Sequence, residues 1–326
     1  MKTVSIFVPE SSVMEAVADP RYMFTAANQF LQAAGKAPLF NVQLVALTKE
    51  VRLHGGVFSV HADKLISEVN QTDLIIIPAL FGDMKTAVEV NQEAIPWIIE
   101  QHNKGAEVAS LCVGAFLLAS TGLLKDKKCS THWAYYNEFR ETFPDVEIMD
   151  GSIITEEKGI YSSGGANSYW NLLLYILEKY TDRDTAILAS KYFAIDIDRS
   201  SQSSFAIFNG QKDHNDEAVK LAQQYLEENF QEKISVDDVA NHVAVSRRSF
   251  ERRFKQSTGN TVLEYLQRIK IEAAKRSFES SRKNINEVMF DVGYTDTKAF
   301  RSVFKKITGL TPIEYRNKYA KVEVAV

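Results

Sequence analysis

Two segments near the carboxyl end have residue types and spacings suited to nucleic-acid chemistry. "SRRSFERRFKQS" and "DTKAFRSVFKKI" each carry two phenylalanines four residues apart, at 250 and 254 and at 300 and 304. Such a pair lies on one face of a helix and is expected to anchor it to a core. The opposite face is cationic, so from the major groove it could reach phosphates or guanine edges. The residues expected to contact DNA are Ser246, Arg247, Arg248, Arg252 and Lys255 in the first segment, and Thr297, Lys298, Arg301 and Lys305 in the second.

These two segments belong to an internal repeat of 50 residues. Eight positions between Phe250 and Tyr265 recur with the same residue types between Phe300 and Tyr315, a match that indicates one structural unit built twice. A short helical stretch and a tight turn precede each segment, which predicts helix-turn-helix units at 234–257 and 284–308. Residues 261–278 have helical period and predict a linker helix of about 27 Å. That length suits two successive major grooves, about 34 Å apart.

The distribution of charge agrees with a nucleic-acid partner. The whole chain has a net charge of -4, but residues 214–326 hold 20 Lys/Arg against 16 Asp/Glu, and residues 1–213 hold 18 against 26. Residues 244–320 alone have a net charge of +9. This is the electrostatic footprint of a DNA-binding module. Charge alone is equally compatible with a solvated helical surface.

A third candidate for chemistry is Cys112, which ends the apolar run "EVASLC" and precedes the helical run "VGAFLLASTG". A cysteine at such a strand-to-helix turn lies at the carboxyl edge of a parallel sheet, where ligand sites are common. A helix N-terminus stabilises a thiolate, so this residue could be a nucleophile or a redox sensor. It could equally be a small residue buried in a tight turn. His132 could be its partner, or a core histidine hydrogen-bonded at a strand end.

The elements that must position Cys112 alternate between strand and helix patterns. Residues 3–8, 42–48, 74–78 and 107–112 have the apolar, β-branched composition of buried parallel strands. Amphipathic stretches at 22–34, 62–69, 94–103 and 166–180 predict helices between and after them. The pattern predicts an α/β domain with a parallel sheet flanked by helices. The polar stretch 200–216 predicts a linker, and only helical patterns follow it.

The duplicated module resembles the AraC/XylS family of bacterial transcription regulators over nearly all of residues 217–320. The resemblance rests on 234–243, 246–259 and "VGYTDTKAFRSVFKKITGLTPIEYR". It implies an all-α domain with two helix-turn-helix motifs that bind a promoter site in double-stranded DNA. In the second copy, Asp296 and Thr297 stand where many relatives carry small residues or serine, which leaves the base preference of that copy open.

Residues 1–199 resemble the ThiJ/PfpI superfamily, whose fold is the class I glutamine amidotransferase-like α/β sandwich. The resemblance rests on Cys112 with "VGAFLLASTGLL", on "STHW" at 130–133 and on "YSSGGANSYWNLLLYILE" at 161–178. It implies that Glu15, which follows the first strand, approaches the thiol of Cys112. In hydrolytic members a histidine follows the cysteine, whereas Val113 stands here, so hydrolysis is disfavoured.

The two resemblances together match the GlxA-like subgroup of regulators. They imply a sensor domain that binds a small-molecule effector near Glu15, Cys112 and His132, a homodimer, and an effector among nitrogenous metabolites. We expect no catalytic residue, cofactor or metal. The alternatives are a cysteine-dependent hydratase or glyoxalase-like enzyme fused to a DNA-binding module, and a redox switch at Cys112. With two cysteines and no apolar run near 20 residues, the chain is expected to be cytoplasmic, without a membrane partner.

Overall fold

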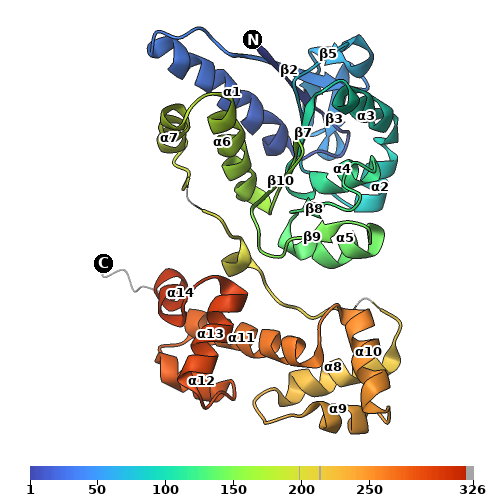
Figure 1. The fold of residues 1–326 in the computed structure, drawn as a ribbon, viewed down its shortest axis with the longest axis vertical. Coiled ribbons are helices and arrows are strands. Elements are labelled where there is room, and N and C mark those ends of the chain that lie inside the picture. Colours follow the sequence, from blue (N-terminus) through green and yellow to red (C-terminus); the bar gives the residue numbers. More distant parts are fainter. Residues whose placement is uncertain (198, 213, 321–326) are drawn as a thin grey trace. The chain divides into compact units, whose positions relative to one another are not determined.

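The computed structural model describes residues 1–197, 199–212 and 214–320, and the chain forms two compact units (Figure 1). The first unit is Met1–Gln202, and the second begins at Ser203. The stretch 200–216 is therefore divided between the units, because Gln202 is buried in the first. In the described part of the chain, no helix combines the length and apolarity that a membrane span requires.

The first unit is built on a central sheet whose strands, in chain order, are β1 (Lys2–Phe7), β2 (Phe40–Ala46), β5 (Lys64–Leu65), β6 (Leu74–Ile77), β7 (Glu107–Ser110), β10 (Ile154–Glu157) and β11 (Ile160–Ser163). Their order in space is β10-β11-β7-β6-β1-β2-β5, and every pairing is parallel except that of β10 with β11. Strand β6 is buried along its whole length, as expected of a parallel strand covered on both faces. Two further pairs are β3 (Glu50–Leu53) with β4 (Phe58–His61), and β8 (Lys128–Cys129) with β9 (Glu147–Ile148).

Helices cover both faces of this sheet, so the predicted α/β fold is confirmed. They are α1 (Met14–Ala33), α2 (Met84–Glu89), α3 (Ile95–Asn103), α4 (Ala115–Ser120), α5 (Tyr136–Thr142), α6 (Tyr169–Tyr180) and α7 (Arg183–Tyr192). Figure 1 shows α1, α6 and α7 on one face and α2, α3 and α4 on the other. One continuous hydrophobic core joins the sheet to these helices.

The structure corrects one helical prediction and extends another. Residues 62–69 form β5 and a 3-10 turn, not a helix. The carboxylate of Asp63 accepts hydrogen bonds from the backbone N–H of Leu44 (2.7 Å) and from Arg21 (2.6 Å), and β5 pairs with the edge strand β2. The prediction is wrong because strand pairing satisfies this backbone better than an isolated two-turn helix does. Helix α1 also begins eight residues earlier than predicted, with Pro20 inside it.

The second unit is helical throughout, as predicted. Its helices are α8 (Glu217–Asn229), α9 (Val236–His242), α10 (Arg247–Thr258), α11 (Val262–Ser280), α12 (Ile285–Asp291), α13 (Thr297–Thr308) and α14 (Pro312–Tyr319). The internal repeat is visible in the helix ends, because α11 and α14 begin with the same capping box: Thr261 with Glu264, and Thr311 with Glu314. The pairs α9–α10 and α12–α13 are the two helix-turn-helix units.

Helix α11 belongs to two hydrophobic cores. Its first half contributes Tyr265 to the core that holds α8, α9 and α10. Its second half contributes Phe278 to the core that holds α12, α13 and α14. Figure 1 shows α11 running between these two groups of helices. The two helix-turn-helix units are therefore joined by a shared, rigid element.

The turns of the two units have the same backbone conformation but different residues. Ala244 has φ +54° in the first turn, and Gly293 has φ +73° in the second. An L-residue in this left-handed region costs about 1–2 kcal/mol, whereas glycine adopts it freely. A Cβ atom at Gly293 would also overlap the backbone oxygen of Gln231.

We predict opposite effects of exchanging these two residues. Ala244→Gly should raise the free energy of unfolding of the second unit by about 0.5–1 kcal/mol, because the strain is relieved. Gly293→Ala should lower it by at least about 1 kcal/mol. Helical circular dichroism during urea unfolding measures this change. All three tryptophans lie in the first unit, so their fluorescence should report an unchanged transition. A Gly293→Ala chain with unaltered unfolding would contradict the prediction.

Candidate functional site

The face of α10 opposite its phenylalanines is exposed and cationic. Phe250 and Phe254 are buried in the first core, with ring centroids 5.5 Å apart. Arg248, Arg252 and Lys255 are exposed and lie at positions i, i+4 and i+7, so they form one stripe along the helix. Within the residues that the structure describes, none of these three forms an ion pair. Their charges are available to an external partner.

Ser246 and Arg247, at the start of α10, are also exposed. Ser246 occupies the N-cap position, but its hydroxyl makes no capping hydrogen bond. The Arg247 guanidinium is already paired, since it donates to Asp237 at 2.8 Å and lies 3.6 Å from Glu251. A DNA contact by Arg247 would require exchange of this exposed ion pair.

Arg253 lies on α10 but serves the fold. Its guanidinium donates two hydrogen bonds to Asp216, at 2.8 and 2.6 Å. Asp216 in turn caps α8 by accepting from the backbone N–H of Val219. The hydrogen bond from Arg253 is the main cause of the lowered pKa of Asp216. This bidentate pair joins α10 to α8 and fixes the orientation of the exposed cationic face of α10. We call this face, formed by Arg248, Arg252 and Lys255, the first reading face, and we call α10 and α13 the reading helices.

The second unit repeats the arrangement on α13. Phe300 and Phe304 are buried with centroids 5.7 Å apart. Three cationic residues are exposed, and none of them forms an ion pair within the described ranges: Lys298, Arg301 and Lys305. Thr297 is half-buried, and Asp296 before it caps the helix by accepting from the backbone N–H of Ala299.

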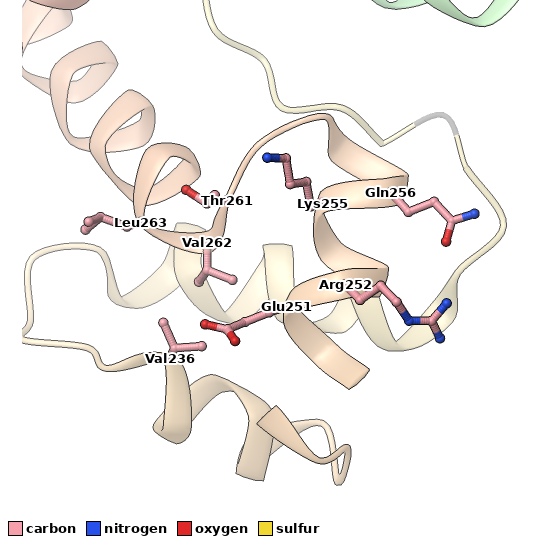
Figure 2. Close-up of a pocket in the computed structure, with 8 residues that line it drawn as sticks. All are labelled: Val236, Glu251, Arg252, Lys255, Gln256, Thr261, Val262 and Leu263. Atoms are coloured by element: carbon pink, nitrogen blue, oxygen red, sulfur yellow. The ribbon is translucent and has the colours of Figure 1, made fainter. Parts of the chain in front are cut away.

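A groove of about 460 Å³ adjoins the first reading face (Figure 2). Its wall is formed by the start of α9, by α10 and by the start of α11. Figure 2 shows Glu251 pointing toward Val236 and Val262, whereas Arg252 extends to the other side of α10. The sequence did not reveal this groove, because its lining comes from three separate elements.

In the first unit, Cys112 occupies a strand-to-helix elbow with φ +54°. Its backbone N–H donates to the hydroxyl of Ser163 at 3.0 Å, and its carbonyl accepts from the hydroxyl of Thr131 at 3.1 Å. Gly114 packs so closely against Pro78 that a Cβ atom there would overlap the proline carbonyl. These contacts hold a backbone conformation that non-glycine residues rarely adopt.

The environment of Cys112 favours the neutral thiol. The residue is 6% exposed, and burial raises the pKa of its thiol to about 11. Hydrogen bonds from the backbones of Ala166 and Val113 act in the opposite direction but are weaker. The helical turn at Cys112–Gly114 leads directly into α4, so Cys112 lies at a helix N-terminus, but burial is the largest influence on the pKa of its thiol. Of the interpretations left open by the sequence, the buried residue in a tight turn agrees best with this environment.

Two acidic side chains of α1 and the Cys112 thiol all act on Tyr169: burial is the main cause of its raised pKa, and the charges of Asp19, Glu15 and Cys112 add to the increase. Glu15 is exposed, and no hydrogen bond joins it to the Cys112 thiol among the described residues. Asp19, one turn later, is half-buried and accepts a hydrogen bond from the hydroxyl of Tyr169 at 2.6 Å. Burial raises the pKa of Asp19, and the charge of Glu15 adds to the increase. Sequence reasoning missed Asp19, although its i+4 spacing from Glu15 places both carboxylates on one helix face.

His132 lies beside Gly165, which has no room for a Cβ atom because the imidazole fills that space. Its Nδ1 accepts a hydrogen bond from the backbone N–H of Ala134 at 3.1 Å, so the neutral ring carries its proton on Nε2. Burial lowers the pKa of His132. No hydrogen bond to the Cys112 sulfur is present in the described part of the chain. In this structure His132 caps a helical turn.

The described residues contain no group of three or more histidine, cysteine, aspartate or glutamate side chains arranged to hold a metal ion.

Two family models match the chain. The model described as DJ-1/PfpI family matches residues 12–179, and the model described as Helix-turn-helix domain matches residues 239–318. The first spans α1, the elbow and every strand of the central sheet except β1, and the second spans α10 and α13.

Known proteins resemble the chain in both parts. The HTH-type transcriptional regulator ArgR of Pseudomonas aeruginosa is 26% identical over 214 residues, which are 65% of each chain. The chain thus spans slightly less than two thirds of that relative's length. The HTH-type transcriptional regulator CdhR of the same organism is 19% identical over 297 residues, 90% of this chain and 87% of that protein. The crystal structure of an AraC family transcriptional regulator from Pseudomonas putida has the same fold over 59% of this chain and 100% of its own (TM-score 0.51, 19% identity).

We predict that Cys112 is a slow thiol. At pH 7.5 iodoacetamide should modify it about 300-fold more slowly than free cysteine, because a pKa of about 11 leaves few thiolates. The rate should rise about tenfold per pH unit until the pH approaches that pKa. Intact-mass spectrometry measures the reaction. Cys129 is the internal control, because burial raises the pKa of its thiol to about 12. Unfolding in urea should expose both cysteines to the reagent. Rapid modification of Cys112 alone at pH 7.5 would contradict the prediction and support a reactive thiolate.

Proposed function

Because the chain belongs to the DJ-1/PfpI family and also carries an AraC-type helix-turn-helix domain, we propose that it is a DNA-binding transcription regulator. Its second unit recognises a specific promoter sequence in double-stranded DNA, and its first unit senses a small metabolite near Cys112. The observation that carries this proposal is the repeated cationic face on α10 and α13. Its residues are exposed, and among the described residues none of them forms an ion pair: Arg248, Arg252, Lys255, Lys298, Arg301 and Lys305.

Several features support sequence-specific recognition by these faces. Each reading helix is fixed by two buried phenylalanines, so its exposed side chains have a defined direction. Arg252 and Arg301 have the planar guanidinium that binds guanine with two hydrogen bonds. Lys255 and Lys305 at the ends of the helices suit phosphate contacts, which position a protein without reading bases.

The first unit is proposed to be a sensor without catalytic activity. The named regulators among its relatives agree with this role. Burial suppresses the thiolate of Cys112, and His132 uses Nδ1 to cap a turn. The elbow fold is retained, while the ionised nucleophile that a cysteine enzyme needs is disfavoured.

The effector is proposed to bind among Glu15, Cys112 and His132. Asp19 and Tyr169, which are hydrogen-bonded to each other, are further candidates for contacting it. Two carboxylates on one face of α1 favour a metabolite with a positively charged group. Occupancy changes the DNA affinity only if the metabolite binds the active and inactive states with different affinity. We also propose that the chain acts as a homodimer, an arrangement common among regulators with paired DNA sites.

The central test of DNA recognition uses duplexes selected by the full chain from a random library. Arg252→Ala should weaken binding by about tenfold, because a guanidinium contact to a base or phosphate is worth about 1–3 kcal/mol. If Arg252 reads a guanine, the base preference at one position should also relax. Fluorescence anisotropy measures the affinity. Arg52→Ala, at a residue whose side chain is 76% exposed in the first unit, removes the same charge as a control. Equal affinities for both variants would contradict the assignment.

Metabolite binding should be visible in the first unit. A cognate metabolite at 100 times its dissociation constant should add about 2.7 kcal/mol to the free energy of unfolding. The tryptophan-fluorescence transition reports it. For a cationic metabolite found in this way, Asp19→Asn and Glu15→Gln should each weaken binding by about tenfold, since each removes a charge–charge contact. Glu141→Gln, an exposed change on α5, is the control. Unchanged affinity in both site variants would place the metabolite elsewhere.

A further inference from the structure

Residues 203–212 form an ordered strap on the second unit, although their composition is that of a linker. The strap begins with a 3-10 turn, Ser203–Phe205, that contacts the second reading helix, α13. It then passes along α11 and ends beside α8. It therefore contacts α13 of the second helix-turn-helix unit, α11, and helix α8, which shares the first core with the first helix-turn-helix unit.

The beginning of the strap is held by the second helix-turn-helix unit. The ammonium group of Lys318 on α14 lies 4.7 Å from the ring centroid of Phe205. The hydroxyl of Tyr319 donates to the carbonyl of Ser204 at 3.5 Å. These contacts attach the strap to the helix that follows the second reading helix.

The end of the strap is held by α8 and by the first core, which also holds the first helix-turn-helix unit. Phe208 packs against the first core, with its ring 5.1 Å from that of Tyr265. The carbonyl of Gln211 accepts from the side chain of Gln223 at 2.7 Å, and Lys212 pairs with Glu227 at 2.6 Å. Gln223 and Glu227 both lie on α8.

The middle of the strap is held by a buried ion pair on α11. Glu272 and Lys275 are 8% and 4% exposed, and their charged groups are 2.8 Å apart. Lys275 donates to the carbonyl of Ala206 at 2.6 Å, and Glu272 accepts from the backbone N–H of Phe208 at 3.2 Å. The pair thus satisfies one acceptor and one donor of the strap backbone on either side of residue 207.

A buried ion pair is a poor source of stability, because removing two charges from water costs as much as their attraction returns. Apolar residues of similar size often stabilise a protein more. The pair instead determines how the strap lies on α11, because only a donor and an acceptor at these two positions match the hydrogen-bonding groups of the strap backbone. It holds the strap in a single register along α11.

On the other side of α11, a second set of contacts joins this helix and the segment after α8 to the second helix-turn-helix unit. Lys270 is about 160° around the helix from Glu272, at 100° per residue. Its ammonium group donates to the carbonyl of Gly293, in the turn of the second unit, at 3.1 Å. Phe230, which follows α8, packs against both cores. The strap and these contacts therefore brace the two units from opposite sides.

We propose that Glu272 and Lys275 are positioning residues: by fixing the strap across both helix-turn-helix units, they set the separation and relative angle of α10 and α13. Neither residue reaches DNA. The geometric part of this inference is independent of DNA, whereas its consequence for recognition rests on the proposed function. In the sequence, the strap follows directly after the last residue of the first unit, so a force transmitted along the chain to Ser203 would act on the strap.

The test measures the distance between the two reading helices in the full chain. Gln256→Cys on α10 and Lys306→Cys on α13 provide exposed sites for nitroxide labels, while Cys112 and Cys129 are buried. Double electron–electron resonance should give one narrow distance distribution. Glu272→Leu with Lys275→Met keeps the volume buried but removes both strap contacts, so the distribution should broaden or shift.

The chain offers a matched control. Glu217 and Lys220 have the same i,i+3 spacing and a 3.0 Å ion pair, but their side chains are 80% and 39% exposed on α8. Glu217→Leu with Lys220→Met should leave the distance distribution unchanged. If the buried double variant loses its helical circular dichroism, Phe208→Ala releases the strap at one point and should broaden the distribution. An unchanged distribution in a folded strap variant would overturn the proposal.

A second readout connects the brace to DNA. Inserting about five base pairs, half a helical turn, between the two halves of a selected site should sharply reduce binding by the parent chain. The buried double variant should discriminate less between the two duplexes, whereas the surface double variant should behave like the parent. If the distances broaden in the buried double variant but the parent chain binds no DNA, the positioning of α10 and α13 by the strap is supported and the proposed function is contradicted. Parent-like discrimination by the buried double variant would contradict the positioning role.

Discussion

The sharing of α11 between two hydrophobic cores is the constraint on which the DNA-binding unit depends. Tyr265 and Phe278 lie on the same helix but in different cores, so neither reading helix can turn without moving the other. The exposed cations of α10 and α13 are useful for recognition only because this rigid connection fixes both sets at once. Buried phenylalanines then orient each helix, the Arg253–Asp216 pair fixes α10 against α8, and the strap adds a brace across both units.

The environment of the elbow in the first unit supports the proposed sensor role better than cysteine catalysis. The elbow at Cys112 keeps the left-handed conformation that presents a nucleophile in cysteine enzymes, and hydrogen bonds to Ser163 and Thr131 maintain it. Burial nevertheless raises the pKa of the thiol, and the neighbouring imidazole is used in a turn. What remains beside the elbow are the carboxylates of α1 and the aromatic side chains of α6. Such a set is suited to holding a ligand, which agrees with the proposed sensor role.

Local patterns allowed much of this to be predicted from the sequence. The 50-residue spacing of the phenylalanine pairs and of the Thr–Glu capping boxes led to both helix-turn-helix units, and buried β-branched runs led to the parallel sheet. Features that depend on distant partners were missed. The sequence around Asp19 is that of a solvated helix face, and only the fold brings Tyr169 beside it. The strap has the composition of a linker, and its anchors Glu272 and Lys275 lie more than 60 residues later, so no local pattern reveals that it is held in place. Burial raises the pKa of the Cys112 thiol, opposite in direction to the effect expected at a helix N-terminus, because the side chain is withdrawn from water.

Fluorescence anisotropy of the full chain with the DNA upstream of its own gene and with a scrambled duplex, at several salt concentrations, tests the central claim most directly. The account predicts tighter binding to the upstream DNA, with an affinity that falls as salt rises because phosphate contacts release counterions. Absence of binding to either duplex at low salt would contradict a DNA-binding role for the two cationic faces. Equal binding to both duplexes at every salt concentration would contradict recognition of that upstream sequence.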